Sequence, residues 1–141
     1  ESISKTNITG MEQSKNALKK YAEEGLEKLK TIKSFDGDNS VTAACKTVLQ
    51  FYIKETDATG TMSEYLLAKE NFEKIKKDFD RKSEPSKADV DNYNAAVNDM
   101  NKKLQKYNQV NNDMNKQRKE ALNNWNKTVN QFFDEYTPRY K

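Results

Sequence analysis

Residues 86–136 read SKADVDNYNAAVNDMNKKLQKYNQVNNDMNKQRKEALNNWNKTVNQFFDEY, with no glycine or proline among them. Their apolar residues recur at alternating steps of three and four, which places them on one face of an α-helix. The stretch therefore predicts one long helix, about 75 Å if unbroken at a rise of about 1.5 Å per residue. One seam position of its heptad reads Val90, Val97, Leu104, Asn111, Arg118, Trp125, Phe132, and the other reads Tyr93, Met100, Tyr107, Met114, Ala121, Thr128.

The middle of this seam is polar at Asn111 and Arg118. Polar residues at a seam position predict a bend, thinner packing or a device that fixes the register of the helices. The two side chains either pair within a closed seam or belong to an opening used for binding. We expect an interaction surface at Asn111 and Arg118, together with Tyr140, which follows Pro138 and is expected to be exposed.

Glycine and proline mark the joints outside this stretch, at Gly37, Gly60, Pro85 and Pro138. The segments between the joints also show helical spacing. The first runs from Met11 to Ile32 on one apolar face. The second, from Val41 to Ile53, is apolar nearly all round and is expected to be the most buried. The third continues the spacing from Met62 to Phe79.

Two of the predicted helices open on a capping box, in which a Ser or Thr hydroxyl and an acidic side chain three residues later bond each other's backbone N–H groups. Thr61 and Glu64 match this pattern before the third segment, and Ser86 and Asp89 form a weaker version before the fourth.

These segments predict an all-α fold in a single domain, residues 1–141. The second and third segments together are about as long as the fourth. The simplest architecture is an elongated antiparallel helical bundle of three rods, with the middle rod broken near Gly60. The alternative is a four-helix bundle in which the fourth helix is broken near Asn111.

Composition agrees with a thin bundle. The chain is 34% hydrophobic and 33% charged, with a mean hydropathy of -1.12, and a bundle needs only one apolar stripe on each helix. Disorder is excluded because the apolar residues are periodic and include six Phe and seven Tyr. The net charge is +3, and the basic and acidic residues are interspersed along the chain. Because they form no one-sided basic patch, no nucleic-acid partner is expected. No apolar run approaches the roughly 18 residues of a membrane span.

The chain has no histidine, and Cys45 is its only cysteine. The commonest general base and the commonest metal ligand are therefore missing. We predict no enzyme activity, no catalytic, cofactor-binding or metal-binding residues, and no cofactor. The carboxylates of Glu23, Glu24, Glu27 and Glu70 are interpreted as solvated, and the acidic turn around Gly37 as a cap for the second helix rather than a calcium loop.

Two further features could serve binding. The ring side chains Tyr93, Tyr107, Trp125 and Tyr136 could form a stacking platform, although their place along the heptad favours the core. The fourth segment also carries twelve asparagines, whose uncharged amides could form hydrogen bonds with a partner or glycan. A compositional bias of an AT-rich genome, in which Lys is equally abundant, is the favoured explanation. The twelve are Asn92, Asn94, Asn98, Asn101, Asn108, Asn111, Asn112, Asn115, Asn123, Asn124, Asn126 and Asn130.

Four stretches of the second half stand out, and they are YLLAKE (65–70), KADVDNYNAAVN (87–98), NNWNKTVNQFFD (123–134) and the final YTPRYK (136–141). Through them, residues 65–141 resemble a family of uncharacterised bacterial surface lipoproteins. Relatives are expected to carry histidine where Tyr136 precedes Thr-Pro, so this chain departs from the pattern there. The resemblance implies export and a lipidated cysteine upstream of Glu1, and it implies no activity and no site residues.

We therefore expect a non-enzymatic protein of the bacterial envelope or surface, acting as an interaction or structural module with an unknown protein or glycan partner. Because the chain starts at Glu1 rather than Met, a removed signal peptide and a trimmed chain are both open. The membrane is expected to be reached only through a lipid anchor upstream of Glu1. The alternatives are a carrier of a small ligand or metal with a pocket between helices, and a cytoplasmic coiled-coil adaptor.

Overall fold

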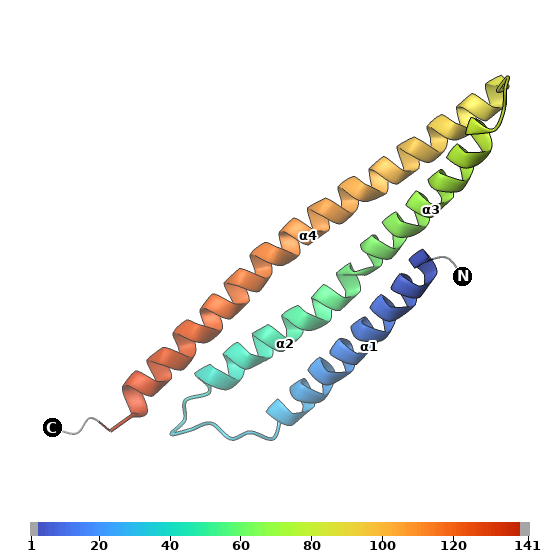
Figure 1. The fold of residues 1–141 in the computed structure, drawn as a ribbon. Coiled ribbons are helices and arrows are strands. Elements are labelled where there is room, and N and C mark those ends of the chain that lie inside the picture. The colour runs from blue at the N-terminus through green and yellow to red at the C-terminus, as the bar shows by residue number, and fades with distance from the viewer. Residues whose placement is uncertain (1–2, 139–141) are drawn as a thin grey trace. The chain divides into compact units, whose positions relative to one another are not determined.

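A computed structural model describes residues 3–138, with side chains described from residue 8. Figure 1 shows four helices, which are α1 (Ile3–Leu29), α2 (Ser40–Ala58), α3 (Gly60–Asp80) and α4 (Lys87–Tyr136). Within the described residues no strand forms, and the only bridge joins Phe35 to Asp38. The predicted all-α helical bundle is confirmed.

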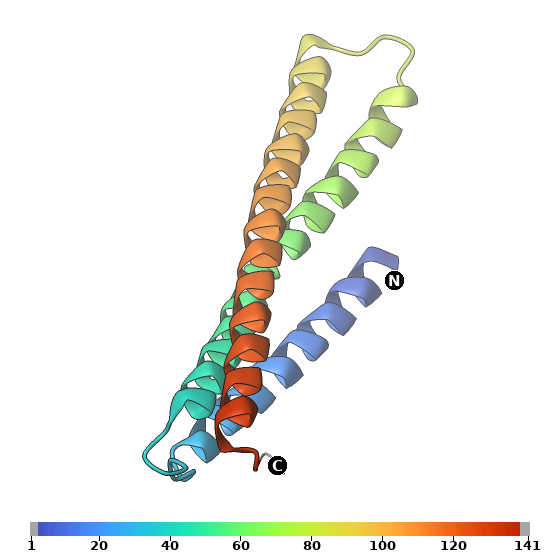
Figure 2. The same ribbon diagram turned by 90° about the vertical axis from the view of Figure 1, so that its left-hand side faces the viewer.

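The chain divides into two compact units. Unit 1 comprises Glu1–Ser14 and Ala58–Asn112, and unit 2 comprises Lys15–Asp57 and Asp113–Lys141. In unit 2, α2 runs antiparallel to α1 and to the C-terminal part of α4 (Figures 1 and 2). In unit 1, α3 runs antiparallel to the N-terminal part of α4. The single domain expected from the length stays a prediction.

The buried apolar residues of unit 2 are mostly small. Phe51 of α2 is 7% exposed, and the other buried apolar side chains of the unit are Ala22, Ala44, Met114 and Ala121. Small residues let helices approach closely, and Gly25 of α1 illustrates this, because a Cβ built there would lie 3.0 Å from Cδ1 of Leu49. As expected from its composition, α2 is rich in buried residues, namely Ala44, Phe51 and Thr56.

Unit 1 is held by aromatic pairs between α3 and α4. The ring of Tyr93 packs on Phe72 and Phe79, with centroids 5.4 and 4.9 Å apart. Tyr107 stacks on Tyr65 at 6.4 Å with an interplanar angle of 12°. Rings arranged in this way add about 0.5–1.5 kcal/mol per pair beyond the area that they bury. Tyr93 and Tyr107 are thus half-buried between α3 and α4, on the seam where the heptad places them.

The capping box predicted at Thr61 is wrong. Thr59 keeps helical backbone angles (φ −64°, ψ −18°) and makes no side-chain cap. The Thr61 hydroxyl donates instead to the carbonyl of Ala58 at 2.9 Å, and the N–H of Met62 donates to the carbonyl of Thr59 at 3.1 Å. Because carbonyls of the preceding turn already accept these bonds, the start of α3 needs no separate cap. Glu64 pairs with Lys106 of α4 at 3.1 Å.

The capping box predicted at Ser86 forms. The Ser86 Oγ accepts the N–H of Asp89 at 3.2 Å, and Asp89 Oδ2 accepts the N–H of Ser86 at 2.8 Å. Both orphan donors at the start of α4 are thereby satisfied. Lys82, in the loop after α3, forms an ion pair with Asp89 and ties the cap to that loop.

From this cap α4 continues for 50 residues, through Asn111. The alternative architecture, with the fourth helix broken near Asn111, is therefore wrong. The predicted heptad describes its packing well, because every residue at the seam position that runs from Tyr93 to Thr128 is buried or half-buried. At the other seam position, Val90 and Asn111 are exposed, and the remaining residues are half-buried.

Candidate interaction surfaces

Arg118 lies in a packed polar network inside unit 2. Its guanidinium forms an ion pair with Glu55 of α2 and donates to Asn115 Oδ1 at 2.7 Å. The guanidinium carbon also lies 6.0 Å from the centre of the Phe51 ring, within the range of a cation–π contact. Because the Glu55 side chain is only 19% exposed, Arg118 neutralises a carboxylate that would otherwise be poorly solvated. These contacts explain why an arginine occupies this position of the seam.

The other two predicted interaction residues have different surroundings. Asn111 belongs to unit 1 and is exposed, so the polar seam position there faces water. Tyr140 lies outside the described residues. Trp125, which the heptad places in the seam, is half-buried. The structure therefore joins Arg118 to Glu55 and not to Asn111.

A tight turn and the end of α4 form an aromatic cluster in unit 2, defined by Phe35, Phe132, Phe133 and Tyr136. Phe35 packs edge-on against Phe132 and Tyr136, with centroids 5.7 and 5.0 Å apart. Phe132 in turn lies 6.3 Å from Phe133. Two of these rings face water, because Phe35 is 58% exposed and Phe133 is 60% exposed. We call this surface the aromatic end.

Backbone geometry at Asp36 and Gly37 holds Phe35 in place. Both residues have positive φ, 55° and 80°, as the two central residues of a type I′ turn require. Phe35 and Asp38 exchange backbone hydrogen bonds of 3.1 and 2.8 Å around them. A Phe directly before an Asp-Gly pair was the signal in the sequence for this arrangement, and it was missed when the turn was interpreted only as a helix cap.

The same turn also caps α2, as predicted. Asp38 Oδ1 accepts the N–H of Ser40 at 2.7 Å. Hydrogen bonds from Ser40, and a further one from the Tyr136 hydroxyl, lower the pKa of Asp38 below its usual value. Partial desolvation raises the pKa of Tyr136, and the carboxylates of Glu135 and Asp38 add to that rise. Asp38 thus connects the start of α2 to the aromatic end.

Ile32 departs from its predicted place. The sequence pattern assigns it to the apolar face of the first helix, but α1 ends at Leu29 and Ile32 follows in the loop, 55% exposed. Lys30, Thr31 and Ile32 each donate a backbone bond to a carbonyl three residues earlier. These bonds form a turn that is tighter than an α-helix, so Ile32 does not continue the apolar face of α1. Its large apolar side chain is left in water.

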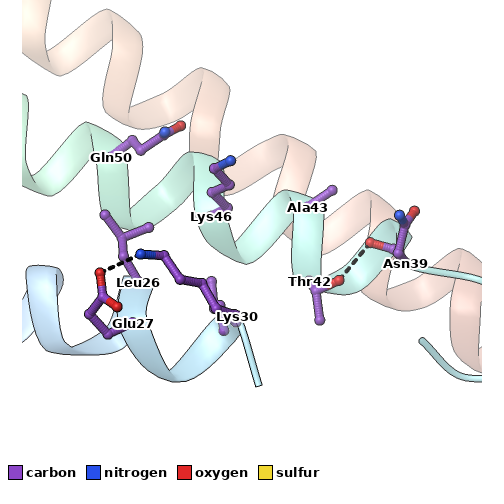
Figure 3. Close-up of a pocket in the computed structure, with 9 residues that line it drawn as sticks. Leu26, Glu27, Lys30, Asn39, Thr42, Ala43, Lys46 and Gln50 are labelled. Carbon is purple, nitrogen blue, oxygen red and sulfur yellow. Dashed lines mark hydrogen bonds and ion pairs between the residues drawn. The ribbon is translucent and has the colours of Figure 1, made fainter. Parts of the chain in front are cut away.

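A groove of about 470 Å³ lies between α1 and α2 of unit 2. Figure 3 shows the Leu26 side chain pointing from α1 toward α2, and the ion pair of Glu27 with Lys30 at 2.6 Å on the same side. Leu26, Leu29 and Ala43 supply apolar surface. Lys46 supplies positive charge, whereas the charge of Lys30 is balanced by its ion pair with Glu27. The groove could therefore seat a small amphiphile with an anionic head.

The carboxylates chosen from the sequence do not gather. Glu23, Glu24 and Glu27 are exposed, as predicted, whereas Glu70 departs from the solvated interpretation because its side chain is only 13% exposed and pairs with Lys74 at 3.4 Å. Among the side chains that the structure describes, from residue 8 to residue 138, no cluster of three or more His, Cys, Asp or Glu could hold a metal ion. No helix in that range combines the length and the apolar character that crossing a membrane needs.

These surfaces differ in what they offer a partner. The aromatic end offers exposed rings, the groove offers apolar surface beside lysines, and the Arg118 network is occupied by contacts within unit 2. Comparison of the chain with protein-family models, with curated proteins and with solved structures found no match.

Proposed function

We propose that this protein is a non-enzymatic, exported protein of the bacterial envelope that acts as an interaction module. The observation that carries the proposal is the aromatic end, where Phe35 and Phe133 stand 58% and 60% exposed on a supported base. Exposed rings of this kind are typical of binding surfaces, since aromatic side chains are enriched at protein interfaces.

The base beneath these rings is ordered by several contacts. The positive-φ turn fixes Phe35, and its edge-on packing on Phe132 and Tyr136 fixes the ring itself. A partner would therefore meet rings that are already ordered, which lowers the entropy lost on binding. Burial of two Phe side chains against a partner would contribute about 1.5–3 kcal/mol each.

Export is supported by the resemblance of residues 65–141 to bacterial surface lipoproteins. Its most specific pieces, Asn123-Asn124-Trp125-Asn126 and Thr137-Pro138 with the basic residue and tyrosine that follow, frame the part of α4 that bears Phe132 and Phe133. The proposal places the aromatic end on the outside of the cell, facing a protein or glycan of the surroundings.

The test places a photo-crosslinking amino acid at Phe133 in the full-length protein of its native cells. The matched control carries it at Asn123, an exposed position of the same helix. We expect external protease to digest the protein on intact cells, and crosslinks from position 133 but not from 123. Protection on intact cells would reject exposure at the cell surface. Protection that also persists after the outer envelope is opened, until the cells are lysed, would reject export and favour a cytoplasmic adaptor. Equal crosslinking from both positions would reject the aromatic end as the binding surface.

The groove between α1 and α2 supports a second candidate, a carrier of small anionic amphiphiles. Lys46 would hold the head group and Leu26 the apolar tail. Calorimetric titration with a medium-chain fatty acid tests it. Saturable binding that is lost in Lys46→Glu would favour the carrier, and binding that is absent or unchanged in that variant would reject it.

A further inference from the structure

Six amides follow one another along one face of α4 in unit 1. They are Asn94, Asn98, Asn101, Gln105, Asn108 and Asn112. Their spacing alternates four and three. With the seam position of Val97 lettered a and that of Tyr93 lettered d, the amides occupy every consecutive b and e position of the heptad over this length. We call this row the amide row. It lies beside the apolar seam and not within it.

All six side chains are exposed. Within the described part of the chain, α4 and its neighbours offer none of them a side-chain hydrogen bond. Asn115, the next position along the row, differs, because its amide accepts a bond from Arg118. The amide row thus consists of hydrogen-bonding groups that the fold itself leaves for water or for a partner.

The surface around the row is almost free of charge. The two flanking rows over the same length contain Ala95, Lys102 and Gln109 on one side and Val97, Leu104 and Asn111 on the other. These twelve positions hold one charged residue, Lys102, in a chain that is 33% charged. An uncharged strip excludes partners that bind through opposite charge and suits a neutral partner.

We infer that the amide row is a contact surface for a second copy of this chain. Each amide carries both donors and an acceptor, so a row of amides is complementary to itself. An identical helix also repeats its amides at the same seven-residue interval, so one favourable contact is followed by others along the whole row. The half-buried edge of Val97 and Leu104 adds apolar surface to the same contact.

Charge is consistent with this pairing. With two copies parallel and in register, flanking Lys102 meets Val97 of the other copy, and Gln109 meets Leu104. An antiparallel alignment that pairs Asn98 with Asn101 brings Lys102 against Ala95. Neither alignment sets like charges opposite each other, which is the commonest penalty when identical surfaces meet.

A neutral polysaccharide is the other occupant with matching chemistry, and the row suits it less well. No aromatic side chain occurs among the twelve positions, so a sugar ring would find no stacking surface there. Amide hydrogen bonds formed at the expense of water are worth only about 0.5–1.5 kcal/mol each. The inference goes beyond the proposed function, because self-contact through unit 1 uses none of the residues of the aromatic end.

Sedimentation equilibrium of the full chain, with thiols kept reduced because Cys45 is free, tests the inference. We expect a reversible dimer. The variant Asn98→Asp/Asn101→Asp/Gln105→Asp should weaken association at least about tenfold, since like charges then face each other across the contact. The matched control Asn92→Asp/Asn123→Asp/Asn130→Asp changes the charge equally at exposed positions of α4 outside the row, and should associate like the unaltered chain.

Three results would overturn the inference. The unaltered chain could stay monomeric at all concentrations. Both triple variants could weaken association equally, which would show an effect of net charge alone. The chain could also be monomeric and co-sediment with an insoluble neutral glucan through the row, which would assign the row to a glycan. Circular dichroism of each variant checks that its helix content is unchanged.

Discussion

At the scale of single residues, Asn111 and Arg118 show how two polar side chains at the same heptad position acquire different roles. They lie two turns apart on α4, yet Asn111 is exposed and Arg118 reaches Glu55 and Asn115. The difference follows from the partner that each side chain meets. The long side chain of Arg118 brings its guanidinium to the Glu55 carboxylate on α2 while its aliphatic part stays packed.

Replacing these residues singly separates their roles. Arg118→Leu should lower the free energy of unfolding by about 1–3 kcal/mol, because it leaves the Glu55 carboxylate largely shielded and unpaired. Asn111→Leu should change it by less than about 0.5 kcal/mol, as is usual for an exposed site. Urea denaturation measures both. The double variant Glu55→Leu/Arg118→Leu should recover most of the loss, and a loss as large as that of Arg118→Leu alone would contradict the shielded-charge account.

At the scale of elements, the turn between α1 and α2 depends on a glycine. Gly37 has φ of +80°, and a side chain there is strained even though a Cβ would meet no neighbour within 4 Å. Gly37→Ala should destabilise the protein by about 1–2 kcal/mol. Gly10→Ala is the matched control, since Gly10 lies in α1 with open space around it and should gain about 0.5–1 kcal/mol. Thermal unfolding of both variants checks the opposite signs, and a neutral Gly37→Ala would reject the turn geometry.

The start of α4 should respond to acid. The pKa of Asp89 is lowered from 3.8 to about 2, first by the hydrogen bond from Lys82 and then by those from Ser86. Because the folded pKa lies below the unfolded one, Asp89 contributes its stability in full above about pH 4 and loses it as the pH falls through about 2. Thermal unfolding should therefore show Asp89→Asn less stable than the unaltered chain at pH 6 and no different near pH 2. An equal gap at both pH values would contradict the linkage.

The same elements show what the sequence could and could not predict. Ser86 follows a loop, so its capping box had free N–H groups to satisfy and could be predicted from four residues. Thr61 has the same pattern, but Thr59 keeps a helical backbone and its carbonyl already accepts the N–H of Met62. That backbone conformation is not encoded in the pattern. Likewise, the heptad placed Arg118 in the seam, whereas its partner Glu55 lies far along the chain and is found only from the fold.

At the scale of the whole molecule, the two compact units each have a core of their own. Phe51 anchors unit 2, and the rings of Phe72, Phe79 and Tyr93 anchor unit 1. The units are not consecutive in sequence, because α1 and α4 each contribute to both. Whether they unfold together or separately decides whether residues 1–141 behave as a single domain.

Phe51→Ala tests this through hydrogen exchange followed by peptide mass spectrometry. The substitution should cost about 3–5 kcal/mol, as expected for a buried Phe. If the units open separately, protection should fall in α2 and in residues 113–136, and should stay close to its original value in α3 and in residues 87–112. The matched variant Phe72→Ala should give the reverse pattern, because its ring packs on Tyr93 in unit 1. Equal loss of protection along both parts of α4 in both variants would instead show one cooperative domain, because the continuous helix would then transmit each loss to the other unit.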